Sequence, residues 1–223
     1  MGSVGSAINQ SQSLYEGRYV EGTPSNQERA DEVVHGVADV LADFGLSDEL
    51  RNIYFNETGT LVRGEANASM NGIGDLHISN KYLRNDIKDS KGYFTSDTFY
   101  GTGAHEAGHA VINGLLKNNV DINTDELNKT SSRINLEKAS ARRLGKLEHA
   151  ILKEASRRYG SNPKISGYGS TKEREKVAEA VSDFYANKAN ANPYSRVIVG
   201  VMKDIKSGAF RPKIKISKRE MGV

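Results

Sequence analysis

The chain has 223 residues, of which 37% are hydrophobic and 26% charged, as in an ordinary single domain with a modest core. The mean hydropathy is −0.58, and no apolar run approaches the roughly 18 residues of a membrane-spanning helix, so we expect no membrane span. The lack of cysteine excludes disulfides and thiolate metal sites, which leaves carboxylates and five histidines as metal ligands. A formal net charge of +3 is too small to indicate nucleic-acid binding, and we expect none.

The two ends of the chain look different from its middle. Residues 1–24 are rich in Gly, Ser, Asn and Gln and lack the apolar segment of a signal peptide. We therefore expect a flexible tail or linker over 1–24, one domain over 25–208, and a basic tail over 209–223. Without a signal peptide, we expect either a cytoplasmic protein or one that a fused or separate carrier delivers. The basic tail is most simply solvated, although it could bind an acidic partner.

The first expected element is a helix that begins near Ser25. Ser25 and Glu28 have the spacing of a capping box, in which each side chain accepts a hydrogen bond from a free backbone N–H group. Apolar residues then recur at helical spacing as far as Leu41, and Gly45 could end the helix.

Residues 52–79 carry short strand-like segments. The runs 53–55 and 60–62 are separated by four turn-forming residues, which predicts a β-hairpin. Residues 75–79 alternate in polarity and predict a third strand, whereas 64–74 are rich in Gly and Asn and predict a loop or an irregular edge strand.

The rest of the chain is expected to be helical. Periodic apolar residues predict a helix over about 98–116 and one long or two short helices over 136–159. Further helices are expected over 171–188 and 194–206, the last preceded by Pro193. The elements together predict an α+β fold, in which a small, mostly antiparallel sheet packs on the 98–116 helix beside a helical C-terminal half.

One motif in the 98–116 helix carries chemistry. His105, Glu106 and His109 form an HExxH sequence, and positions four apart lie on one helical face, so both imidazoles can face one ion. Glu106 is turned about 100° away and is better placed to act as a general base than as a ligand of the same ion. The helix is otherwise apolar, and two imidazoles on a buried face require partners.

A second motif lies in the 171–188 helix. Glu175 and Glu179 are also four residues apart, and Ser182 continues their face with a small side chain that permits close helix packing. Two carboxylates at such a contact would repel each other unless a cation lies between them. Spacing alone leaves open which is the metal ligand, since Glu179 could bind the ion with Asp183 behind it. A solvated acidic face is the plain alternative.

The remaining histidines lack ligand spacing. We expect His35 and His149 to be surface residues and His77 to be a structural residue of its strand.

The two motifs, HExxH and Tyr-Gly-x-Thr-x-x-x-Glu-x-x-Ala-Glu-Ala, resemble those of gluzincin-type zinc metallopeptidases, in particular the protease domain of anthrax lethal factor and its relatives in bacterial toxins and prophages. The resemblance covers about 101–110 and 166–184 and does not extend to 111–165. It implies a zincin-like fold and a zinc cofactor. The residue roles that it implies are metal ligation by His105, His109 and Glu175, general-base catalysis by Glu106, assistance at the scissile carbonyl by the hydroxyl of Tyr168, and a hydrogen bond from a ligating histidine to Glu179.

The function that the resemblance implies is zinc-dependent hydrolysis of peptide bonds in an extended protein or peptide substrate, by a toxin, an effector or a phage-associated protease. Two alternatives stay open. The chain could be a zinc-containing structural or binding module of a phage particle without turnover, or a regulatory protease that acts on one cytoplasmic partner.

Overall fold

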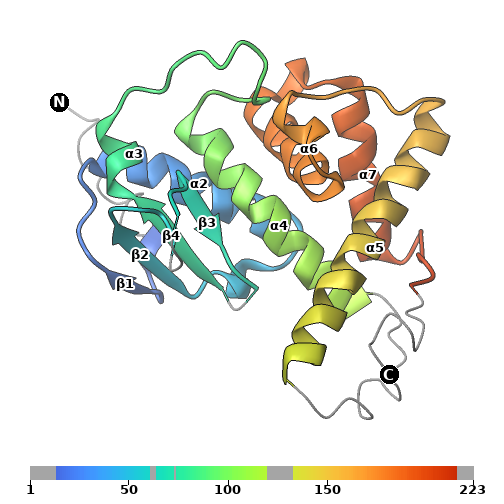
Figure 1. Cartoon of the computed structure of the whole chain (residues 1–223), viewed down its shortest axis with the longest axis horizontal. Coiled ribbons are helices and arrows are strands. Elements are labelled where there is room, and N and C mark those ends of the chain that lie inside the picture. The colour runs from blue at the N-terminus through green and yellow to red at the C-terminus, as the bar shows by residue number, and fades with distance from the viewer. Residues whose placement is uncertain (1–13, 61–63, 73, 120–132, 215–223) are drawn as a thin grey trace.

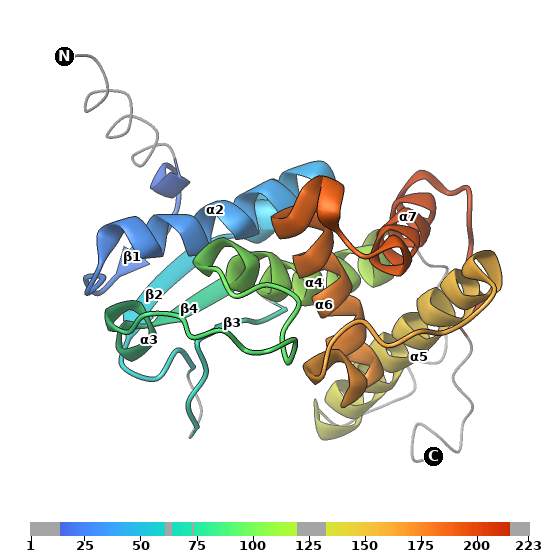
Figure 2. The ribbon, with the colours of Figure 1, turned by 90° about the horizontal axis from the view of Figure 1, so that it is seen from above.

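The computed structural model describes residues 14–60, 64–72, 74–119 and 133–214. The fold is α+β, as expected. Helix α4 (Phe99–Asn119) lies between a four-stranded sheet on one side and the C-terminal helices on the other (Figures 1 and 2). None of the described helices carries an apolar run of the length that a bilayer requires.

The sheet is mixed, so the expectation of a mostly antiparallel sheet is wrong. Its strands are β1 (Tyr19–Glu21), β2 (Asn52–Asn56), β3 (Ala68–Met70) and β4 (Asp75–Ser79), and their order is β1-β2-β4-β3. Strand β2 pairs in parallel with both β1 and β4, and only β3 is antiparallel to its neighbour β4. The segment 64–74 thus contains an edge strand, which was one of the two expected outcomes.

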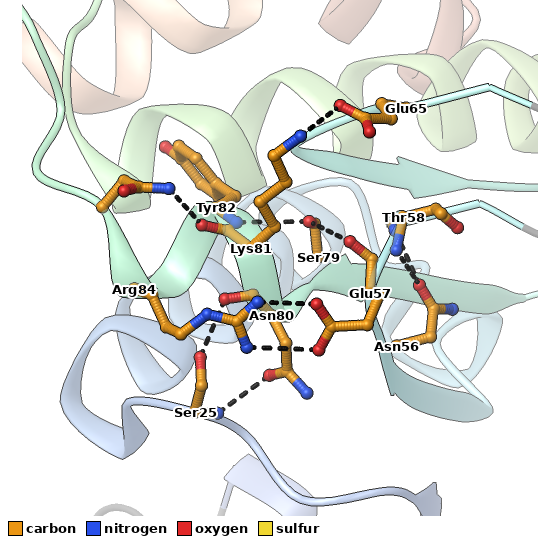
Figure 3. Close-up of polar contacts among 12 residues, drawn as sticks. Ser25, Asn56, Glu57, Thr58, Glu65, Ser79, Asn80, Lys81, Tyr82 and Arg84 are labelled. Carbon is orange, nitrogen blue, oxygen red and sulfur yellow. Dashed lines mark hydrogen bonds and ion pairs between the residues drawn. The ribbon is translucent and has the colours of Figure 1, made fainter.

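The predicted hairpin is wrong because both edges of β2 are occupied by parallel neighbours. At the end of β2, Oδ1 of Asn56 accepts hydrogen bonds from the backbone N–H groups of Thr58 and Gly59, at 3.2 and 2.6 Å (Figure 3). After this Asx-type turn the chain lies beside the segment that leads into β3, since the N–H of Ala66 donates to the carbonyl of Thr58 at 2.9 Å. The residues 61–63, which include most of the predicted second strand, lie outside the described part of the chain.

Two described segments lie inside the stretches that we expected to be tails. Strand β1 lies inside the segment 1–24 that we expected to be a tail. In the expected basic tail, Phe210 and Ile214 pack partly buried against the core. Residues 1–13 and 215–223 lie outside the described residues.

The N-terminus of α2 (Gln27–Asp43) differs from the predicted capping box. Asn26 is the N-cap, and its side chain accepts a hydrogen bond from the N–H of Arg29 at 3.2 Å. Ser25 instead binds α3 (Asn80–Arg84), since its N–H donates to Oδ1 of Asn80 at 2.8 Å and its hydroxyl donates to the carbonyl of Asn80 at 2.9 Å (Figure 3). Asn26 and Ser25 are both good caps, so spacing alone could not choose between them.

The short helix α3 was not predicted, whereas α4 and the C-terminal helices α5 (Arg133–Tyr159), α6 (Glu173–Asn187) and α7 (Pro193–Ser207) match the predictions closely. Residues 133–159 form one long helix, not two, and Gly208 ends the last helix in a left-handed conformation. Helices α2 and α4 cross closely at Gly36 and Gly103, where a Cβ atom on either glycine would lie about 2 Å from a backbone oxygen of the other helix.

Candidate metal centre

The HExxH motif lies in the middle of α4, where the helix is packed on two sides. Gly108 contacts α6, since a Cβ atom there would lie 3.0 Å from Cα of Ala178. Ala104, Ala107 and Val111 are fully buried around the motif. The two histidines therefore project into a narrow space between α4 and α6, as the small residues of both helices predict.

His105, His109 and Glu175 converge there. Oε2 of Glu175 lies 3.4 Å from Nε2 of His105 and 3.4 Å from Nε2 of His109. Their three donor atoms lie within 4.8 Å of one another. Neither 3.4 Å contact has hydrogen-bond geometry, so this buried oxygen has no hydrogen-bond partner among the described residues. The three residues could hold a metal ion.

Glu179 lies behind His105. Nδ1 of His105 donates to Oε1 of Glu179 at 2.9 Å, and the Glu179 side chain is only 2% exposed. The second oxygen of Glu179 accepts the N–H of Thr95 at 2.8 Å. Glu179 therefore fixes the orientation of the His105 ring and leaves Nε2 directed towards Glu175.

The alternative arrangement, in which Glu179 is the ligand and Asp183 supports it, does not fit this geometry. Asp183 faces the other way: it accepts Nδ2 of Asn187 at 2.6 Å and the N–H of Asn192, just before α7, at 2.8 Å. Glu173 lies on the surface, where it accepts Nδ1 of His149 at 3.0 Å. Of the four acidic residues of α6, only Glu175 faces both imidazoles.

Glu106 and Tyr168 lie beside the three converging residues. Oε2 of Glu106 accepts the N–H of Met70 in β3 at 3.1 Å, which fixes the carboxylate at the sheet side of α4. Tyr168 belongs to a short 3₁₀ turn before α6, and the centre of its ring lies 5.8 Å from the centre of the His105 ring. The structure thus brings together all six predicted site residues.

The carboxylates dominate the electrostatics of the centre. Burial alone would lower the pKa of His105, but its contacts with Glu175 and Glu179 outweigh burial and raise the pKa to about 10. Burial would raise the pKa of Glu175, whereas the two imidazoles hold it well below the usual value. Burial and the nearby charge of Glu175 raise the pKa of Tyr168 to about 12, so its hydroxyl stays protonated at neutral pH.

An open cleft reaches the centre. It has a volume of about 540 Å³ and runs from His105 and Glu106 towards Tyr82. One wall of the cleft is formed by residues 65–68, which lead into the edge strand β3. The segment between α3 and α4 forms another wall, where Tyr93 and Phe94 are exposed. Of the three converging residues, His105 lines this cleft, so the cleft reaches one side of the centre.

The other three histidines lie elsewhere. His35 and His149 are exposed, as expected, and each contacts one carboxylate. His77 is buried in the sheet, where its ring stacks on that of Tyr54 at 4.6 Å. None of the three joins a cluster of ligand groups within the described ranges.

Sequence reasoning missed two groups of contacts at the centre. Thr95 binds Glu179, and Asn187 binds Thr95, but these residues lie outside both motifs. Arg174 places Nε 3.3 Å from Oε1 of Glu175, the oxygen that faces away from the imidazoles. Of these residues, only Arg174 could have been suspected from the sequence, because it directly precedes the candidate ligand Glu175.

Comparisons of the chain with protein-family models, curated proteins and solved structures gave no match. The resemblance of the two motifs to gluzincin-type peptidases therefore stays an expectation drawn from the residues quoted for it.

Proposed function

We propose that the protein is a zinc-dependent endopeptidase with a zincin-like fold. The observation that carries this proposal is the buried oxygen Oε2 of Glu175, which faces Nε2 of both histidines of the HExxH motif while Glu179 occupies the other nitrogen of His105. A buried carboxylate oxygen without a hydrogen-bond partner is costly, and a cation shared with two imidazoles removes that cost.

Zinc is the metal that fits the donor set best. Two imidazole nitrogens and one carboxylate oxygen are a common set at catalytic zinc sites, where a fourth position stays open. The chain contains no cysteine that would favour a closed structural site. When bound, zinc supplies Lewis-acid polarisation of a carbonyl group and lowers the pKa of a water molecule.

Glu106 is the proposed general base. Its carboxylate lines the cleft next to His105, and its hydrogen bond with Met70 holds it in place without involving it in the ligand set. In hydrolysis it takes a proton from the attacking water and returns that proton to the leaving nitrogen.

Tyr168 is the proposed donor to the scissile carbonyl. Because its hydroxyl is protonated at neutral pH, it can donate a hydrogen bond to the carbonyl oxygen as that oxygen gains negative charge. Its ring packs against Tyr93 and Phe94, with ring centres 5.8 and 5.3 Å away, so the hydroxyl is held on a supported ring.

The cleft suits an extended peptide. Strand β3 is at the edge of the sheet and pairs with β4 on one side, and Ala68, its first residue, lines the cleft. A substrate strand could add to the outer edge of β3 at Ala68, next to the Met70 N–H that Glu106 occupies, by main-chain hydrogen bonds and pass the metal centre. The substrate is thus proposed to be an unfolded or extended segment of a protein.

The test compares wild-type protein with Glu106→Gln, each loaded with zinc, on a peptide library derived from a proteome. New N-termini should appear with the wild-type protein and fall by orders of magnitude with the variant, while zinc content stays equal. Equal cleavage by both proteins would refute the mechanism. Full zinc content without cleavage by either would favour the binding module without turnover.

A further inference from the structure

A short segment before α4 contacts both motifs of the candidate centre. This strap, Gly92–Thr95, belongs to the connection between α3 and α4 that arches towards α6 (Figure 1). It precedes the HExxH motif by ten residues and lies far in sequence from Glu179. Its contacts are mostly main-chain, so no side-chain motif marks it.

One end of the strap holds Glu179 in two ways. The N–H of Thr95 donates to the carboxylate oxygen Oε2 at 2.8 Å, and the Thr95 hydroxyl donates to the main-chain carbonyl of Glu179 at 3.1 Å. Asn187, two turns further along α6, donates to the carbonyl of Thr95 at 3.0 Å. Thr95 is therefore fixed on α6, and it fixes the Glu179 carboxylate that orients His105.

The other end of the strap holds Tyr168. The N–H groups of Gly167 and Tyr168 donate to the carbonyls of Gly92 and Tyr93, at 3.0 and 2.7 Å. This pairing brings the backbones so close that a Cβ atom on Gly167 would lie 2.8 Å from Cδ2 and 3.1 Å from Cα of Tyr93. A side chain at position 167 would thus require the Tyr93 ring, and the strap backbone beside it, to shift.

We propose that the strap sets the positions of His105 and Tyr168 relative to each other. It acts on His105 through Glu179, and Thr95 is the main positioning residue. This inference rests on the proposed function, because it assigns the strap to the same metal centre. The physical reason is that both oxygens of Glu179 must be bound for its carboxylate to hold one imidazole orientation. The strap supplies the bond to the second oxygen and ties it to the backbone that carries Tyr168.

A pair of substitutions at Thr95 separates hydrogen bonding from packing. Both variants keep the N–H that binds Oε2 of Glu179. Thr95→Val keeps the shape of the side chain and loses the hydroxyl that fastens Thr95 to α6, whereas Thr95→Ser keeps that hydroxyl and loses a methyl group. We expect Thr95→Val to weaken zinc binding at least about threefold, less than the roughly 10–100-fold typical for loss of a residue such as Glu179, and Thr95→Ser to stay within about twofold of wild type. The measurement is competition for zinc with a chromophoric chelator, together with the visible absorption spectrum of the cobalt(II)-loaded protein.

Thr58→Val is the matched control. Its hydroxyl also donates to a main-chain carbonyl, that of Thr60 at 3.0 Å, but it lies beyond β2 and away from the centre. Zinc affinity and the cobalt spectrum should stay those of wild type. Weaker binding in Thr95→Ser than in Thr95→Val would show a packing role and overturn the inference.

Gly167→Ala tests the strap from the Tyr168 end. It touches neither imidazole, yet it should weaken zinc binding by displacing the strap, whereas Gly200→Ala in α7, where a Cβ atom meets nothing within 4 Å, should not. Wild-type affinity in both Gly167→Ala and Thr95→Val would refute the strap inference alone. Failure of the wild-type protein to bind zinc would refute both the inference and the proposed function.

Discussion

His105, between α4 and α6, and His77, in the sheet, are both little exposed but lie in different surroundings. Nδ1 of His77 accepts Nδ2 of Asn56 at 3.2 Å, and its ring stacks on Tyr54. Burial lowers the pKa of His77 more than the nearby charge of Asp75 raises it. Both ring nitrogens of His105 face carboxylates. There the carboxylates raise the pKa more than burial lowers it.

The difference lies in how the neighbouring carboxylates are used. Asp75, the acidic residue nearest His77 in the strand, is occupied by the side-chain amides of Asn52 and Asn71, at 2.6 and 2.9 Å. Glu175 instead leaves one buried oxygen unbonded towards two imidazoles. Burial of a histidine therefore does not indicate a metal site, whereas convergence of imidazoles on an unsatisfied carboxylate oxygen does.

The largest expected effect separates the two histidines directly. His105→Ala should abolish tight zinc binding because it removes a ligand, whereas His77→Ala should leave the zinc content of the folded protein unchanged. Metal analysis of both purified proteins after dialysis against zinc measures this. Loss of zinc in His77→Ala, with circular dichroism showing a folded protein, would contradict the comparison.

Substitutions along α6 should have graded effects. Glu179→Ala should weaken zinc binding roughly 10–100-fold, because it frees the His105 ring, and Glu175→Ala should weaken it more. Asp183→Ala should change affinity least, since Asp183 binds Asn187 and the start of α7. Chelator competition gives the order, and a stronger effect of Asp183→Ala than of Glu179→Ala would invalidate it.

The last expected effect is the release of a proton when the metal binds. Because the pKa of metal-free His105 is raised to about 10, its imidazole is protonated at neutral pH and must lose a proton to bind a metal. Apparent zinc affinity should therefore rise with pH below that pKa, by up to about tenfold per unit. Titration calorimetry in two buffers of different ionisation enthalpy should show about one proton released per zinc. Heats independent of the buffer would show that His105 is neutral before binding.

The site was largely predictable because its signals are local. The i, i+4 spacings of His105/His109 and Glu175/Glu179 place each pair on one helical face, and the apolar residues around them predict burial. Spacing alone left both glutamates open as the ligand, and the choice of Glu175 rested on the resemblance and on the small residues Ser182 and Ala186 that continue the Glu175/Glu179 face. The geometry brings Glu175 to both imidazoles, which supports that choice.

The missed features depend on contacts between distant segments. Strand β1 is only three residues long and lies in a polar segment, so its parallel pairing with β2 has no local signal. The prediction of a mostly antiparallel sheet was wrong for the same reason, since the whole fold sets which strands pair and in which direction. Thr95 escaped notice because its N–H contributes as much as its side chain, and any residue except proline has that group.

The central claim is that His105, His109 and Glu175 hold one zinc ion, and anomalous diffraction at the zinc absorption edge from crystals of the loaded protein tests it most directly. The account predicts one strong peak per chain, at about 2.0–2.1 Å from Nε2 of each histidine and about 2.0–2.2 Å from a Glu175 carboxylate oxygen, with Glu179 still bound to Nδ1 of His105. A peak bound to Glu179 with Glu175 in solvent, or a peak at His77 in place of α4, would contradict it.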